Sequence, residues 1–120
     1  MHLETLKRNG DFRRAYGRGK SQAHAALVTY AVKNRAGKTR YGITASKKLG
    51  NAVERNRCSR VIGEALRTLD EPTLGNWDLV FVARTKTKFI KSTRLQEIIY
   101  GQLQAMGVVA NPANAPVKRQ

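Results

Sequence analysis

The segment from Lys47 to Arg67, KKLGNAVERNRCSRVIGEALR, constrains this chain most, because it is basic on one side and apolar on another. At 100° per residue, a helix from about Asn51 to Leu69 gathers its apolar residues into one stripe that packs on a sheet. This stripe consists of Cys58, Val61, Ile62, Ala65, Leu66 and Leu69. The other sides carry Arg55, Asn56, Arg57, Ser59, Arg60, Gly63 and Arg67. Such a helix can dock on a core and present cations to a polyanion, which favours a nucleic-acid partner.

The net charge points the same way. The 120 residues match one ordinary domain, and 41% hydrophobic content is enough for a core. A formal charge of +15 repels itself in the folded state and calls for an anionic partner. No apolar stretch approaches the roughly 20 residues that span a bilayer, and the N-terminal residues lack the apolar run of a secretory signal. With one cysteine there is no disulfide framework, so we expect a cytoplasmic location.

Two regions alternate in the manner of strands. Residues 25–33 place Val28, Tyr30 and Val32 on one face, and the residues between them on the other. Residues 39–46 place Tyr41, Ile43 and Ala45 opposite Arg40, Gly42, Thr44 and Ser46. The Asn34–Gly37 stretch between them predicts a hairpin turn. Residues 78–83 are nearly all apolar, as expected of a strand buried on both faces.

Two further helices complete the prediction. Asn9 is expected to cap a short helix that runs to Tyr16 or Gly17. Thr93 and Gln96 have capping-box spacing, and the helix they open carries Leu95, Ile98, Ile99, Leu103 and Met106 before Gly107 closes it. Residues 1–107 are therefore predicted to form one domain, and 108–120 a disordered tail. The fold class is a single-domain α+β two-layer sandwich in the order α-β-β(-β)-α-β-α.

Residues that could catalyse a reaction are sparse. His2 and His24 have no acidic partner nearby in sequence, and Cys58 lies on the apolar stripe, where a buried inert thiol is expected. Zinc spacing and a Walker-type loop are both missing. Scattered carboxylates such as Asp11 and Glu64 permit a metal ion beside RNA but do not argue for one. If the chain takes part in a reaction, the catalytic groups belong to a partner.

Cations, in contrast, recur in three clusters, and the second contains the Arg55-Asn56-Arg57 triplet. Two guanidinium forks with an amide between them, close to Gly50, suit phosphate oxygens and base edges. Phe12, Tyr16 and Tyr30 could line a concavity where single-stranded bases stack, although they could equally be core. The clusters are Lys7, Arg8, Arg13, Arg14, Arg18 and Lys20; Lys47, Lys48, Arg55, Arg57, Arg60 and Arg67; and Arg84, Lys86, Lys88 and Lys91.

Together these residues resemble the signature of the bacterial ribonuclease P protein subunit. The resemblance rests on Lys47-Lys48-Leu49-Gly50-Asn51-Ala52-Val53 followed by the arginine triplet and Arg60, and it covers about residues 5–106. Asp11-Phe12, Tyr16, Gly19, Tyr41-Gly42-Ile43 and Val82-Ala83-Arg84 fit in the right order. The combined motif is specific, whereas a lone R-N-R triplet would be weak.

The resemblance implies a fold, a reaction and partners. The fold is an α/β sandwich with a left-handed β-α-β crossover of the ribosomal-protein-S5-domain-2 type. Catalysis belongs to a large RNA that positions Mg²⁺, while the protein binds this RNA and the 5′ leader of precursor tRNA and is inactive alone. Carried over to this sequence, the RNA-facing residues are Lys47, Lys48, Asn51, Arg55, Asn56, Arg57, Arg60 and Arg67. The leader-facing residues are Phe12, Arg13, Tyr16, Tyr30, Thr44 and Ser46.

Three positions depart from the family pattern, and other function classes have less support in the sequence. Ser59 and Gly63 stand where relatives often carry Lys or Arg, and Tyr16 replaces a common Phe. The alternative reading is a noncatalytic ribosome-associated or RNA-chaperone protein. A self-sufficient nuclease would need a carboxylate or histidine cluster, DNA binding lacks a helix-turn-helix or zinc signature, and peripheral membrane binding lacks a bulky apolar helix face.

Overall fold

The central strand of the sheet is β5, Trp77–Ala83, which is buried on both faces as its apolar sequence predicts. The computed structural model describes residues 4–67 and 76–109, and within these ranges five strands form one sheet in the order β1-β4-β5-β3-β2. β4 pairs with β5 in parallel and β3 pairs with it antiparallel. The remaining strands are β1 (Glu4–Thr5), β2 (Lys20–His24), β3 (Leu27–Lys33) and β4 (Arg40–Thr44).

The predicted hairpin between residues 25–33 and 39–46 is wrong. β3 and β4 both exist, with the predicted faces, but β5 lies between them. The hairpin partner of β3 is β2, in a register that pairs His24 with Leu27. The predicted order allowed for one extra strand but gave it no residue range. His24 helps to form the turn between β2 and β3, because its Nδ1 accepts a hydrogen bond of 3.0 Å from the Ala26 N–H. β2 escaped notice because its sequence, KSQAH, is polar and largely exposed.

Two helices cover one face of the sheet. They are α2 (Ala52–Leu66) and α3 (Ser92–Ala105), and their apolar stripes enclose the main core with Leu27, Leu79 and Phe81. Cys58, Ile62, Ala65 and Leu66 of the predicted α2 stripe are buried, and Leu69 lies outside the described residues. A buried amide docks α3, because Gln102 accepts a hydrogen bond of 2.6 Å from Thr29 and donates to the Leu27 carbonyl at 3.1 Å.

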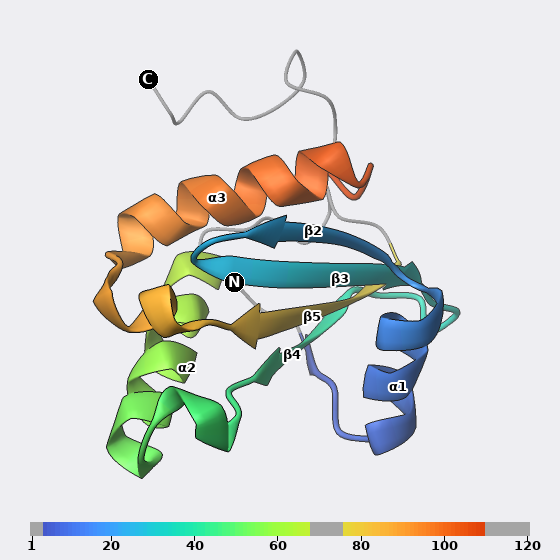
Figure 1. Cartoon of the computed structure of the whole chain (residues 1–120). Helices are drawn as coiled ribbons and strands as arrows, with labels where there is room; N and C mark the ends of the chain where they lie inside the picture. The colour runs from blue at the N-terminus through green and yellow to red at the C-terminus, as the bar shows by residue number, and fades with distance from the viewer. Residues whose placement is uncertain (1–3, 68–75, 110–120) are drawn as a thin grey trace.

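The third helix, α1 (Asn9–Arg18), packs on the opposite face at one end of the sheet (Figure 1). Leu6, Ala15 and Val80 form a small second core there, with Phe12 and Tyr30 packed against it. Gly42 makes this close packing possible, since a Cβ at that position would lie only 2.5 Å from the Phe12 ring. Because α1 is short, part of this sheet face stays uncovered.

A buried carboxylate joins α1 to the sheet. Asp78 is completely buried on β5 and accepts hydrogen bonds from Arg14 at 2.8 Å and from Arg40 at 2.9 and 2.8 Å. The Asn34 amide donates a further bond of 2.7 Å to the same carboxylate. A buried charge is tolerated only when it is paired in this way. Asp78 therefore fixes α1, the β3–β4 connection and β4 on the central strand.

Several predicted element ends need correction. Arg8 and Lys91, rather than Asn9 and Thr93, precede α1 and α3, and neither helix has a side-chain cap. α2 ends at Leu66 instead of Leu69. Gly107 does close α3, with φ +80°, but Val108 and Val109 are buried in the main core, so the packed domain extends past residue 107. Residues 110–120 of the predicted tail lie outside the described residues.

The order of elements agrees with the predicted fold class. β4, α2 and β5 form a parallel β-α-β unit, as the family resemblance implied. Trp77, at the start of β5, belongs to the main core. No helix within the described ranges is long and apolar enough to cross a membrane.

Candidate nucleic-acid interface

A short turn connects β4 to the arginine-bearing helix. The 3-10 helix η1, Lys47–Leu49, follows β4 and buries only Leu49. Gly50 has φ +137°, and a Cβ there would collide with the Glu54 carboxylate. Asn51 then caps α2 in a capping box. Its side chain accepts a hydrogen bond of 2.9 Å from the Glu54 N–H, and the Glu54 carboxylate accepts one of 3.1 Å from the Asn51 N–H. Asn51, predicted to face RNA, thus has a structural role.

The outer face of α2 carries the predicted cations. Asn56, Arg57 and Arg60 are exposed and have no ion pair with a described residue. Arg55 differs, because it is half-buried and its Nε is shielded without a hydrogen-bond partner among the described residues. Arg67 also differs, since it pairs with Glu64 at 3.0 Å. Arg57 and Arg60 are therefore the guanidinium groups of α2 that are most available to a phosphate.

Two shallow depressions lie along α2. The first runs over its outer face, where Gly63 leaves open space because a Cβ there would meet nothing within 4 Å. The second lies between α2 and the start of α3, and Arg60 borders both. The first is lined by Asn56, Ser59, Arg60, Gly63, Glu64 and Arg67. The second is lined by Arg60, Val61, Glu64, Ile90, Lys91, Ser92 and Thr93.

The uncovered sheet face holds the predicted aromatic site. Tyr16 is 41% exposed, its hydroxyl lies 2.8 Å from Thr44 Oγ1, and its ring meets Tyr30 edge to face with centroids 5.0 Å apart. The structure therefore brings Tyr16, Tyr30 and Thr44 together. Phe12 is packed between α1 and Gly42, so it supports the site more than it lines it. Arg13 on α1 and Ser46 beyond β4 are exposed.

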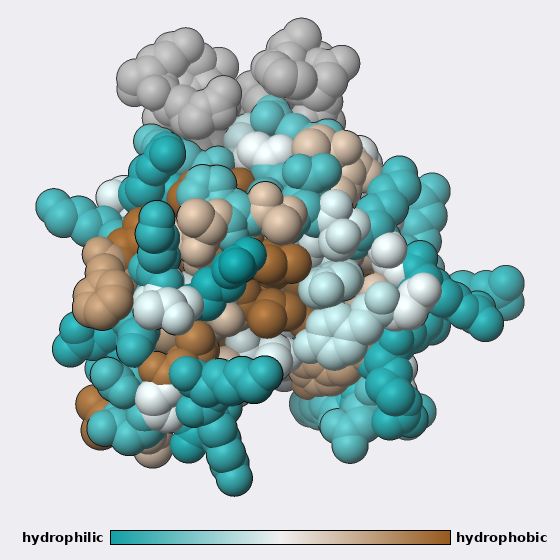
Figure 2. Space-filling model, in the orientation of Figure 1, coloured by the Kyte–Doolittle hydropathy of each residue, from teal (hydrophilic) through white to brown (hydrophobic). Residues whose placement is uncertain are grey.

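Two valines also belong to this face, although the sequence did not lead us to include them among the site residues. Val28 and Val82 are half-buried and lie opposite each other in the β3–β5 pair, and Thr44 pairs with Val82 from the other side. Apolar atoms reach the surface in the middle of Figure 2, with hydrophilic residues on both sides. Strand parity could have found them, because Val28 shares its face with Tyr30. The open face is thus apolar at its base and polar at its rim.

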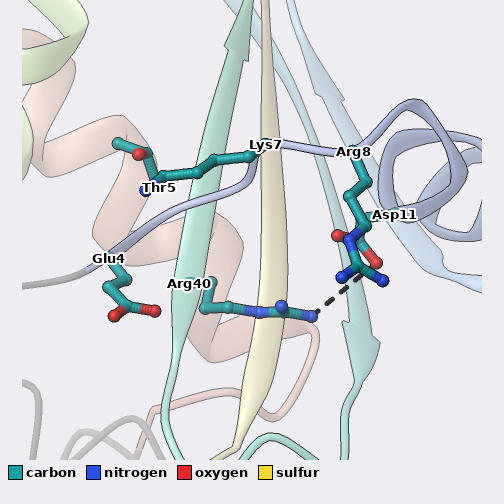
Figure 3. Close-up of a pocket in the computed structure, with 6 residues that line it drawn as sticks. All are labelled: Glu4, Thr5, Lys7, Arg8, Asp11 and Arg40. Atoms are coloured by element: carbon teal, nitrogen blue, oxygen red, sulfur yellow. Dashed lines mark ion pairs between the residues drawn. The ribbon is translucent and has the colours of Figure 1, made fainter.

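Acidic side chains are few, and those in the described ranges are engaged by cations. Every carboxylate in the described ranges forms an ion pair. A third depression, at the start of α1, shows this mixture: Lys7 and Arg8 line it beside Glu4 and Asp11, and Arg40 lies 3.8 Å from Asp11 (Figure 3). Hydrogen bonding to Asp78 raises the pKa of Arg40, which stays charged.

The groups that could support protein-based catalysis are few. Cys58 is buried, and burial raises the pKa of its thiol, so it is a poor nucleophile. No group of three or more His, Cys, Asp and Glu side chains within 4–67 and 76–109 could hold a metal ion. His2 lies outside these ranges.

Fold and surfaces together define a small basic α/β protein of the RNA-binding class, with exposed arginines on one helix and an aromatic open sheet face. The chain belongs to the ribonuclease P protein family, whose model matches residues 2–106. The ribonuclease P protein component of Clostridioides difficile is 46% identical over 69% of this chain and 74% of the relative. That of Clostridium botulinum (strain Langeland) is 38% identical over 90% of this chain and 98% of the relative.

Solved structures agree with the family assignment. The RNase P protein of Staphylococcus aureus has a TM-score of 0.77 and 32% identity, over 91% of this chain and 100% of that one. The RNase P protein of Thermotoga maritima has a TM-score of 0.70 and 25% identity, over 82% and 93%. The resemblance drawn from the sequence is therefore confirmed. Family membership makes the chain part of a tRNA-processing ribonuclease, and it disfavours the ribosome-associated alternative.

Proposed function

We propose that the chain assists removal of the 5′ leader from precursor tRNA by binding two RNAs at once. The outer face of α2 binds the catalytic RNA subunit, and the open sheet face binds the leader. The observation that carries this proposal is the exposure of Arg57 and Arg60 without an ion pair to a described residue, in a structure where the described carboxylates are all paired.

The α2 face suits a folded RNA backbone. Each guanidinium can donate two parallel hydrogen bonds to phosphate oxygens, and the neighbouring Asn56 can reach a base edge. Each phosphate contact releases counterions, so the logarithm of affinity falls with the logarithm of salt by about 0.7 to 0.9 per contact. Lys47 and Lys48 are exposed just before α2 and extend the same positive surface. Phosphates that repel each other near the cleavage site would be brought together here.

The open sheet face suits a single strand. An extended leader can stack bases on Tyr16 and Tyr30 and rest on Val28 and Val82, with Arg13 near the backbone. Stacking of this kind contributes about 1–3 kcal/mol per base and depends little on sequence. A leader of varied sequence is the substrate such a surface can hold.

Mg²⁺ belongs to the RNA subunit in this proposal. The described residues do not fit a metal site, because their carboxylates are engaged with Lys and Arg and no metal-binding cluster forms. The protein then supplies binding and charge neutralisation, while the RNA and its ions carry out cleavage. We also infer a cytoplasmic location, where the single thiol, Cys58, stays reduced.

Reconstitution tests the proposal. Precursor tRNA is incubated with the chain alone, with its cognate RNA subunit alone, and with both, over a series of Mg²⁺ concentrations. We expect no cleavage by the protein alone and the largest gain from adding it at low Mg²⁺. Cleavage by the protein alone, or no gain at any Mg²⁺ concentration, would contradict the proposed role.

A further inference from the structure

An aromatic ring that the proposed function does not use is largely exposed to solvent. Phe89 ends the 3-10 helix η3, Thr85–Phe89, and is 77% exposed. A phenylalanine usually gains stability by burial, and the other two phenylalanines, Phe12 and Phe81, pack in the two core clusters. One exposed ring by itself is ordinary. What sets Phe89 apart is how firmly its surroundings are held and how strongly they are charged.

The two residues that precede Phe89 are anchored to the rest of the protein. Lys88 Nζ lies 5.7 Å from the centroid of the Phe89 ring, donates a hydrogen bond of 2.7 Å to the Leu49 carbonyl and pairs with Glu54 at 3.6 Å. Thr87 is buried, and its hydroxyl donates to the Ala26 carbonyl at 2.5 Å. A cation near the ring also polarises it. Phe89 is thus carried by a well-fixed turn, with one cation beside it.

The charge around the ring is positive. Arg84, Lys86 and Lys91 are exposed and have no ion pair with a described residue, and Glu54 is already engaged by Lys88. The residues directly after Phe89, Ile90 and Lys91, line the depression that Arg60 borders from α2. η3 packs against α2, at the end of the sheet away from α1 (Figure 1). Phe89 therefore extends the α2 surface and is separate from the leader-binding face.

We infer that Phe89 is a stacking platform for an unpaired nucleobase of the RNA subunit, with Lys86 and Lys91 contacting the flanking phosphates. An aromatic ring surrounded by cations matches a nucleotide in both of its parts, base and phosphate. A second copy of this chain would bring two strongly basic surfaces together, which the charge of +15 opposes. The inference rests on the proposed function and adds a base contact to a surface that otherwise offers phosphate contacts.

Four variants test it through the affinity of the full chain for its RNA subunit. Phe89→Ala and Phe89→Leu should each weaken binding by about tenfold, equal to about 1.4 kcal/mol, while Phe89→Tyr should stay within about twofold. Thr5→Ala is the control, since Thr5 is neutral and exposed on β1, outside the α2 surface. Because no phosphate contact is lost, the salt slope should not change in Phe89→Ala, although it should fall in Arg57→Ala. Thermal unfolding should be unaffected.

Each other outcome has a clear meaning. Binding of Phe89→Ala equal to wild type would overturn the inference while leaving the proposed function intact. Full affinity in Phe89→Leu alongside a loss in Phe89→Ala would show apolar contact without stacking, and would also overturn it. Sedimentation that reveals a Phe89-dependent dimer would assign the ring to a second copy. Failure of the wild-type chain to bind the RNA would defeat both proposals.

Discussion

The arginines packed near α1 and the arginines exposed on α2 have different roles. Near α1, the guanidinium groups that face the sheet are tied to carboxylate, as Arg14 and Arg40 are to Asp78. On α2, Arg57 and Arg60 point outward without an ion pair to a described residue. On the α1 side Arg14 and Arg40 hold the structure, and the tyrosines with Arg13 are left for a ligand, whereas on α2 the exposed charge is the main binding group. Binding should therefore depend strongly on salt at α2 and weakly at the open sheet face.

The largest expected effect comes from breaking the paired side. Asp78→Ala leaves Arg14 and Arg40 without their buried partner, and we expect the free energy of unfolding to fall by about 3–5 kcal/mol. Urea denaturation followed by circular dichroism measures it. Glu97→Ala is the control, because its pair with Arg94 at 3.0 Å is exposed and should contribute less than about 1 kcal/mol. Similar losses in both variants would show that Asp78 does not hold α1 in place.

The next effect concerns the aromatic site. Tyr16→Ala should weaken binding of leader-bearing precursor tRNA to the holoenzyme by about 1–3 kcal/mol, and leave binding of mature tRNA unchanged. Tyr16→Phe keeps the ring but loses the 2.8 Å hydrogen bond to Thr44, so it should retain most of the affinity. Tyr16 is a cleaner target than Phe12, which also packs against Gly42. Equal losses for both tRNAs would exclude this face as the leader site.

The α2 surface could be predicted from sequence because its geometry is local. Helical periodicity alone placed Cys58, Ile62 and Leu66 in the core, and all three are buried. Once that stripe is inward, the arginines on the other sides of the same helix must face outward. The same logic holds for α3, where Leu95, Ile99 and Leu103 are buried as expected. Only the ends of these helices were misplaced, since Thr93 lacks the predicted capping role.

The open sheet face could be predicted only in part, because it depends on pairing between distant segments. Alternation correctly separated the two faces of each strand, but it reveals neither that Tyr30 and Thr44 lie on the face that α1 covers nor that β5 lies between β3 and β4. Asn34 gave a real turn signal, accepting a hydrogen bond of 2.9 Å from the Ala36 N–H. The Asn34 amide also donates a hydrogen bond to Asp78 on β5, so the turn belongs to a connection that passes the end of β5 and does not close a β3–β4 hairpin. Local turn chemistry does not specify which strand becomes the neighbour.

A smaller effect is expected from the exposed arginines of α2, on binding of the RNA subunit. Arg57→Ala or Arg60→Ala should weaken holoenzyme assembly about tenfold at low Mg²⁺ and less at high Mg²⁺, because divalent ions then screen the phosphates. The salt slope of binding should fall by about 0.7 to 0.9. Arg67→Ala is the control and should cost less, since Arg67 is already paired with Glu64. A loss that is equal at all Mg²⁺ concentrations would count against an electrostatic role.

A cation can also be added to the α2 surface, which should increase rather than decrease its affinity for RNA. Gly63 lies in the first depression with open space around it, so Gly63→Lys should be accommodated without strain. It should also improve helix propensity by replacing glycine. A new phosphate contact would steepen the salt slope by about 0.7 to 0.9. An unchanged slope would mean that RNA does not pass over this part of α2.

The smallest expected effect lies at the edge of the sheet, where Glu4 on β1 pairs with Lys38 at 2.8 Å. A hydrogen bond and charge attraction from Lys38 lower the pKa of Glu4 below its ordinary value of 4.5. A lowered pKa in the folded state stabilises the fold above the unfolded value, and this contribution disappears as the pH falls through the folded one. Titration followed by NMR should show the Glu4 pKa rising in Lys38→Ala and moving much less in Lys7→Ala, since Lys7 acts only at longer range. Because both partners are exposed, salt should weaken the Glu4–Lys38 pair far more than the buried contacts of Asp78. The ion pairs on this side of the molecule therefore differ in strength according to their burial.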